Sequence, residues 1–206
     1  LIYLASIKDL FNGALVGYAM SERMTTSLVS QALFRAVAAK RPAKGLIHHS
    51  DRGSQYCAHA YRKQLQQFGM QASMSRKGNC WDNAPMESFW GSLKNELVHH
   101  RRFTTRTQAR QEITEYIEIF YNRIRKQARL GYLSPAQFTQ QYHAKQIAAN
   151  PLDSTVDDLP HTHAISQHRK SMFQNAGLVV SEVMIFQFAE QGKFRGHVTG
   201  QRFHQA

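Results

Sequence analysis

The segment Gly45-Leu-Ile-His-His-Ser-Asp-Arg-Gly-Ser-Gln-Tyr56 decides the fold, because it joins a short apolar run to a carboxylate and a turn. Residues 45–51 fit a β-strand that ends on Asp51, and Arg52-Gly53 is typical of a turn. Consecutive side chains of a strand point to opposite faces of a sheet, so His48 and His49 are not expected to bind one metal ion together. The segment therefore predicts a sheet strand with an acidic side chain at its end.

Helical and strand-like patterns alternate on both sides of this strand. In the helix that is predicted to begin at Thr25 or Thr26, the apolar residues recur on one face, and Pro42 marks its end. This alternation predicts an α/β fold with a mixed sheet flanked by helices. The expected elements are strands over 2–8, 14–20, 45–51 and 70–74, and helices over about 26–40, 58–68 and 86–99.

Two helices follow a polar loop over 75–85. In the first helix, Glu87, Gly91 and Lys94 fall on one exposed stripe, and the opposite side carries the apolar residues Met86, Phe89, Leu93 and Leu97. A capping-box pattern, Thr105-x-x-Gln108, opens the second helix. The expected buried stripe of that helix is Ile113, Tyr116, Ile117, Phe120 and Ile124.

The composition suits a folded, basic protein. Hydrophobic residues make up 42% of the 206 residues, and 26 Lys and Arg against 14 Asp and Glu give a net charge of +12. A surplus of this size favours a polyanionic partner, with nucleic acid first. No apolar run is long enough to span a bilayer, and the two cysteines exclude a disulfide framework. A reduced, cytoplasmic setting is expected.

The charge is divided unevenly along the chain. Residues 1–149 hold 21 Lys and Arg and 9 Asp and Glu, whereas residues 150–206 hold 5 of each kind. The change falls at the turn dipeptide Asn150-Pro151. We therefore expect a functional body over 1–149 and a C-terminal tail of unknown role over 150–206.

Asp51 and Glu87 are the candidate chemical residues. Carboxylates at a strand end and a helix start can converge on Mg²⁺, and two such ions can clamp the attacking and leaving oxygens of a phosphodiester. The alternative is structural, with Asp51 capping a turn and Glu87 complementing a helix dipole.

Several motifs resemble those of bacterial insertion-sequence DDE transposases with a retroviral-integrase-like catalytic core. His49–Tyr56 resembles the segment of the family's second carboxylate, and Asn79-Cys-Trp-Asp-Asn-Ala-Pro-Met-Glu-Ser-Phe-Trp90 resembles that of the third. The 35 residues between Asp51 and Glu87 equal the family's spacing. Tyr121–Arg125 and Leu130–Ala136 resemble the end of this core. The resemblance covers about residues 2–142 and implies an RNase H-like fold.

The resemblance implies roles for single residues. Asp51 and Glu87 would be catalytic and would bind metal, with two Mg²⁺ or Mn²⁺ ions in the intact site. Lys94 matches a basic position that contacts DNA, and Arg76 and Lys77 are expected to contact phosphates, with solvated charge as the alternative. The implied partners are DNA, as element ends and target duplex, and further copies of the chain in the active complex. Association with the nucleoid is expected when DNA is bound.

The family's first carboxylate belongs on a central strand that would precede Leu1. We therefore expect an N-terminally truncated core that is inactive as given, because no other Asp, Asp82 included, is expected to replace that carboxylate. Loss of the strand is expected to leave the strands over 2–8 and 45–51 without ladder partners. Residues 150–206 resemble no part of the family.

The function expected of the intact protein is DNA transposition and integration by metal-dependent phosphodiester cleavage and strand transfer. One alternative is a non-catalytic DNA-binding remnant of a decayed mobile element. Another is a structure-specific nuclease of the same fold.

Overall fold

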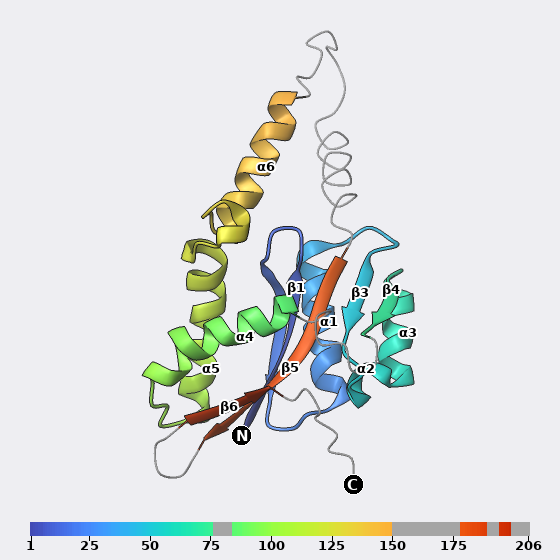
Figure 1. The fold of residues 1–206 in the computed structure, drawn as a ribbon. Helices are drawn as coiled ribbons and strands as arrows, with labels where there is room; N and C mark the ends of the chain where they lie inside the picture. The colour runs from blue at the N-terminus through green and yellow to red at the C-terminus, as the bar shows by residue number, and fades with distance from the viewer. Residues whose placement is uncertain (76–83, 150–177, 189–193, 199–206) are drawn as a thin grey trace.

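The predicted N-terminal hairpin forms one side of a mixed sheet (Figure 1). In the computed structural model, which describes residues 1–75, 84–149, 178–188 and 194–198, β1 (Ile2–Asp9) pairs antiparallel with β2 (Leu15–Ser21). On the other side of the sheet, β3 (Ile47–Ser50) pairs parallel with β4 (Gln71–Met74). The strand order in the described part is β2-β1-β5-β3-β4.

The centre of the sheet is occupied by β5 (Leu178–Phe188), which comes from the C-terminal tail. This strand runs antiparallel to β1, from the pair Ile2–Phe186 to the pair Asp9–Val179, and parallel to β3. The prediction that β1 and β3 lack ladder partners is therefore wrong. The apolar run of the tail supplies the N–H and C=O groups that both strands need. A further strand, β6 (Phe194–Val198), pairs antiparallel with β5.

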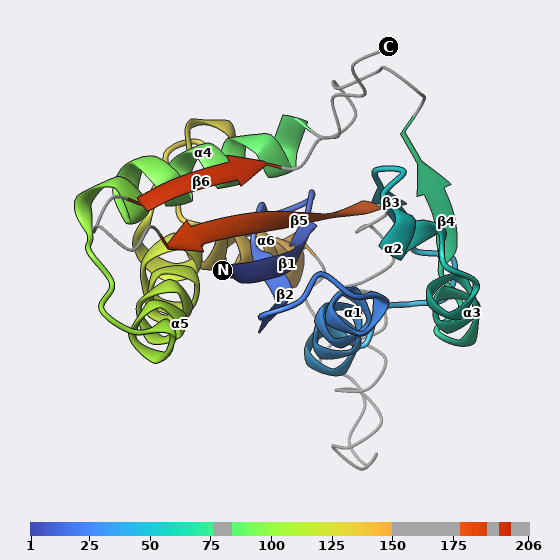
Figure 2. The same ribbon diagram turned by 90° about the horizontal axis from the view of Figure 1, so that it is seen from below.

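Helices cover both faces of the sheet (Figure 2). One face packs against α1 (Thr26–Lys40) and α3 (His59–Gln67), with the short α2 (Ser54–Cys57) between β3 and α3. The other face packs against α4 (Ala84–Glu96), α5 (Arg106–Glu115) and η3 (Tyr116–Ile124). β1 contributes to both cores because its side chains alternate between the two faces.

The approach of α1 to β2 requires a glycine. A Cβ atom added to Gly17 would lie 2.5 Å from the carbonyl oxygen of Ala32 and 2.6 Å from the Cβ of Ala36. Any side chain at position 17 would therefore force α1 away from the sheet.

The helix predicted to open at Thr105 changes its geometry halfway. It begins as expected, with the Thr105 hydroxyl accepting a hydrogen bond from the Gln108 N–H at 3.1 Å, and then continues as the π-helix η3. A π-helical turn is wider than an α-helical turn, so the residue that faces the core comes one position later in the sequence. Phe120 and Ile124 are therefore 39% and 57% exposed, against our prediction, and Tyr121 is buried in their place.

The remaining described elements are short or lie at the edge of the fold. They are η2 (Val98–His100), η4 (Ala128–Leu130) and α6 (Pro135–Ala149), and Figure 1 shows α6 extending away from the sheet. Val98 of η2 is buried in the core beside α4. Among the helices of the described ranges, none has the length and apolar character needed to cross a membrane.

Candidate active site

Asp51 follows β3 directly, as predicted, and its carboxylate is held by a turn. Its Oδ1 accepts a hydrogen bond from the Gly53 N–H at 2.8 Å, and a Cβ added to Gly53 would lie only 2.9 Å from that oxygen. Partial burial raises the pKa of Asp51, and the Gly53 N–H acts in the opposite direction. A cation placed beside this carboxylate would favour its ionised form.

The two histidines of β3 lie on opposite faces of the sheet, which confirms the prediction from strand alternation. His48 is buried under α3, where its Nε2 lies 3.0 Å from the Tyr61 hydroxyl. His49 lies 2.9 Å from the Ser73 hydroxyl and 3.1 Å from the Ser75 hydroxyl, one at each ring nitrogen. Each histidine therefore has its own hydrogen-bond partners, on its own face of the sheet.

Glu87 lies in the first turn of α4, with its side chain exposed. Met86, Phe89, Trp90 and Leu93 are buried against the sheet, so the predicted apolar side of this helix is confirmed. On the other side, a Cβ added to Gly91 would meet no described atom within 4 Å, and Lys94 is half-buried. Glu87 and Gly91 thus leave part of this helix open to a partner.

Polar contacts hold both ends of α4. At its start, the Lys8 Nζ donates to the Pro85 carbonyl oxygen at 2.9 Å. At its end, Glu96 accepts from Arg125, with an Nη2–Oε1 distance of 2.8 Å, and from the Tyr116 hydroxyl at 2.7 Å. α4 also packs against β5 (Figure 1). The helix that carries Glu87 is therefore fixed relative to the sheet.

The fit of a divalent ion is incomplete within the described residues. Asp51 and Glu87 offer carboxylate oxygens, the ligand type that Mg²⁺ prefers. However, no group of three or more His, Cys, Asp or Glu in the part of the chain that the structure describes could hold a metal ion. Glu182 of β5 pairs through its backbone with Ser6 of β1. The residue before it, Ser181, pairs with Ser50, the last residue of β3.

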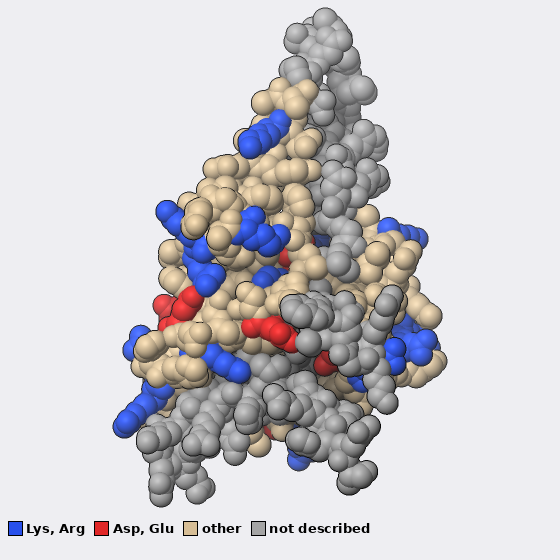
Figure 3. All heavy atoms as spheres, viewed as in Figure 1, with Lys and Arg blue, Asp and Glu red and all other residues tan. Residues whose placement is uncertain are grey.

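The expected DNA contacts are only partly described. Lys94 lies on the helix of Glu87, whereas Arg76 and Lys77, like Trp81 and Asp82, lie outside the described residues. Lys and Arg side chains are spread over the face shown in Figure 3, where acidic side chains are fewer. This distribution agrees with the net charge of +12.

Sequence reasoning missed the residues that support this site. Lys8 follows Ile2, Leu4 and Ser6 on the β1 face that α4 covers, so a lysine at a buried strand position was an available signal. Asn122 bonds the backbone of Leu15 twice, accepting from its N–H at 2.9 Å and donating to its C=O at 3.0 Å. The Tyr121-Asn122 motif therefore joins η3 to β2.

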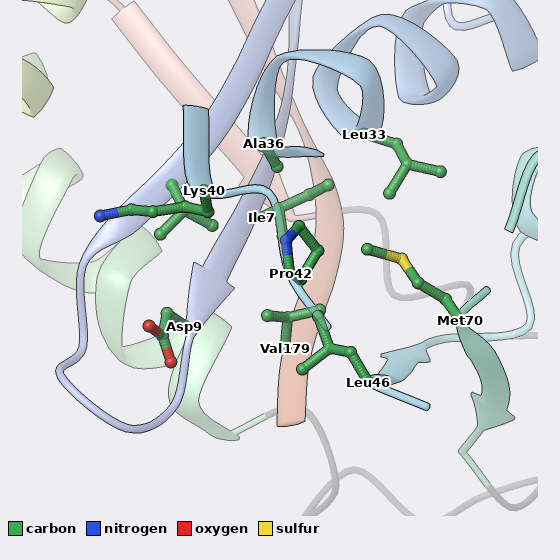
Figure 4. Close-up of a pocket in the computed structure, with 10 residues that line it drawn as sticks. Ile7, Asp9, Leu33, Ala36, Lys40, Pro42, Leu46, Met70 and Val179 are labelled. Carbon is green, nitrogen blue, oxygen red and sulfur yellow. The ribbon is translucent and has the colours of Figure 1, made fainter. Parts of the chain in front are cut away.

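A small cavity lies on the other face of the sheet, under α1 (Figure 4). Its volume is about 40 Å³. It is lined mostly by apolar side chains of α1, of β1 and of the residues just before β3 and β4, together with Val179 of β5. Asp9 and Lys40 lie at one side of it (Figure 4). α1 belongs to one layer of helices and α4 to the other, so this cavity does not belong to the site of Glu87.

Comparisons with known proteins agree with the motifs. Two family models match the chain, both described as "Integrase core domain", one over residues 1–80 and the other over residues 87–142. A 31 kDa protein of insertion element IS600 from Shigella sonnei is 60% identical over 148 residues, which are 72% of this chain and 54% of that protein. The transposase for insertion sequence element IS904 from Lactococcus lactis subsp. lactis (strain IL1403) is 47% identical over 137 residues, 66% of this chain and 54% of that protein. The chain thus spans about half the length of these relatives.

A solved structure resembles the fold. It is a cryo-EM structure of the simian T-cell lymphotropic virus intasome in complex with PP2A regulatory subunit B56 gamma, with a TM-score of 0.52 and 14% identity. The match covers 77% of this chain and 52% of that chain. At this identity the likeness concerns the fold alone, and it confirms the predicted α/β class with an integrase-like, mixed sheet.

Proposed function

The chain belongs to the integrase-core family of bacterial insertion-sequence transposases, and from this premise we propose that it is the core portion of a protein that cleaves DNA and transfers its strands during transposition. The observation that carries the proposal is the placement of Asp51 and Glu87. Asp51 directly follows β3, and Glu87 lies in the first turn of α4, which packs against the neighbouring strand β5. In this proposal, both carboxylates bind metal.

Two Mg²⁺ or Mn²⁺ ions would supply the chemistry of the intact site by holding the attacking and leaving oxygens. The chain's own contribution is to hold Asp51 through Gly53 and to fix α4 through Lys8 and Glu96. Lys94 would contact a DNA phosphate beside Glu87, and Arg76 and Lys77 would contact further phosphates. DNA element ends and target duplex are the proposed partners, with further copies of the chain in the active complex, on the bacterial nucleoid.

We also propose that the 206-residue chain does not cleave DNA by itself. This rests on the described residues, among which no group of three or more His, Cys, Asp or Glu could hold a metal ion. Such a chain would still bind DNA through its positive charge, as expected of a non-catalytic DNA-binding remnant.

The test is incubation of the 206-residue chain with labelled duplex DNA and Mn²⁺, with DNA binding measured in parallel. We expect binding that weakens steeply with salt and no metal-dependent cleavage. Cleavage that is lost in Glu87→Gln would overturn the proposal of inactivity. If Glu182→Gln also abolished that cleavage, β5 would be the source of the third carboxylate.

A further inference from the structure

We propose that Lys8 is a positioning residue that fixes the first turn of α4, and with it Glu87, over the central strands. This inference rests on the proposed function of Glu87 as a metal-binding carboxylate. It adds a residue from β1 to a site whose other members come from β3 and α4.

The contacts of Lys8 join three elements. Lys8 is only 5% exposed, and its Nζ donates to the carbonyl oxygen of Pro85, two residues before Glu87. The same Nζ lies 5.7 Å from the centre of the Tyr121 ring of η3. The Arg125 guanidinium also lies 5.7 Å from the centre of this ring. β1, α4 and η3 therefore meet at this ammonium group.

A lysine at this place is costly, which makes its contact with α4 informative. Burial, together with the nearby charges of Arg129 and Arg125, lowers the pKa of Lys8 to about 8. An apolar side chain would avoid this cost, since the neighbouring β1 residues of this face, Ile2 and Leu4, pack in the core. What the lysine adds is a donor that reaches α4.

The far end of α4 offers a matched control. Arg125 and Tyr116 bond Glu96 there, nine residues after Glu87 in the sequence. Tyr116→Phe would remove a hydroxyl donor at the end distant from Glu87, whereas Lys8→Met would remove the donor at the near end with little change of side-chain volume. Each of these two variants removes one contact at an end of α4, and together they separate loss of position at Glu87 from general loosening of the helix.

The experiment measures Mn²⁺-induced broadening of backbone amide NMR signals over residues 84–90 of the 206-residue chain, together with hydrogen exchange along α4. In Lys8→Met we expect the Mn²⁺ concentration for half-maximal broadening to rise about tenfold or more, as for other residues that orient metal ligands. Exchange should also become faster over residues 86–90 than over 93–96. Tyr116→Phe should show the opposite pattern of exchange and little change in the Mn²⁺ response.

Each result decides one of the two proposals. If Glu87→Gln leaves the Mn²⁺ response unchanged, the metal-binding role of Glu87 is wrong, whatever Lys8 does. If Glu87→Gln removes the response but Lys8→Met alters neither it nor the exchange pattern, the positioning role is overturned.

A measurement on the unaltered protein covers the case in which Lys8→Met does not fold. The Lys8 Nζ signal should show slow exchange of its protons with water, because the group is buried and bonded to Pro85. A Nζ signal that exchanges as fast as that of the exposed Lys44 would overturn the proposal.

Discussion

Replacing Lys8 by Met should change how the stability of the protein depends on pH. The folded chain lowers the pKa of Lys8 from 10.5 to about 8, chiefly by burial. Between these two values the unfolded chain binds a proton that the folded chain does not, so the free energy of unfolding rises with pH through this window. Below pH 8 the folded chain carries the full cost of the buried charge.

The size of this effect follows from the shift. One pKa unit corresponds to 1.36 kcal/mol, so the shift of Lys8 corresponds to about 3 kcal/mol. Lys8→Met lacks the titrating group, so its own free energy of unfolding does not carry this cost. The difference in free energy of unfolding, Lys8→Met minus unaltered protein, should therefore be about 3 kcal/mol larger at pH 7 than at pH 10.5. Subtracting the two proteins cancels the titration of all other groups that behave alike in both.

The assay is urea unfolding of both proteins at several values between pH 7 and pH 10.5. Lys44→Met, at an exposed position, serves as the control, and its difference from the unaltered protein should stay within about 0.5 kcal/mol at every pH. A flat difference for Lys8→Met as well would refute the reasoning, because it would show that Lys8 is not a buried ammonium in the folded chain.

Three further predictions follow from α4 and β5. Gly91→Ala should raise the free energy of unfolding by up to about 1 kcal/mol, because no described atom lies within 4 Å of the added Cβ. The same substitution should weaken DNA binding if a duplex approaches this side of α4. Unchanged DNA affinity in a titration would show that the duplex does not come close there. Lys94→Ala should reduce the slope of log affinity against log salt by about one unit, and an unchanged slope would exclude a phosphate contact. Deleting residues 150–206 should remove the cooperative thermal transition, because β1 and β3 lose their common partner; a sharp transition at the original temperature would show that the sheet does not need β5.

The elements that depend on local pattern could be predicted from the sequence. The strand over residues 2–8 and the helix start at Thr105 are properties of neighbouring residues, and the structure confirms both. The same holds for the opposite faces of His48 and His49 and for the apolar side of α4. Within the site, Asp51 at the end of a strand and Glu87 in the first turn of a helix were also predictable.

The features that depend on distant parts of the chain could not be predicted. The position of β5 between β1 and β3 rests on pairing between segments far apart in the sequence, although its strand-like run was recognisable. The π-helix that buries Tyr121 instead of Phe120 is not marked by any period in the sequence, and Tyr121 packs in a core with residues of β1 and β2 that are far away along the chain. The hydrogen bond from Lys8 to Pro85 spans 77 positions of sequence.

The central claim is that Asp51 and Glu87 are two of the carboxylates that bind metal for DNA strand transfer. Its most direct test is strand transfer by a longer protein of which we propose the chain to be the core portion, with DNA that carries the element's ends and with Mg²⁺ or Mn²⁺. Asp51→Asn and Glu87→Gln should each abolish strand transfer and leave DNA binding intact. Strand transfer at the unaltered rate in either variant would contradict the account.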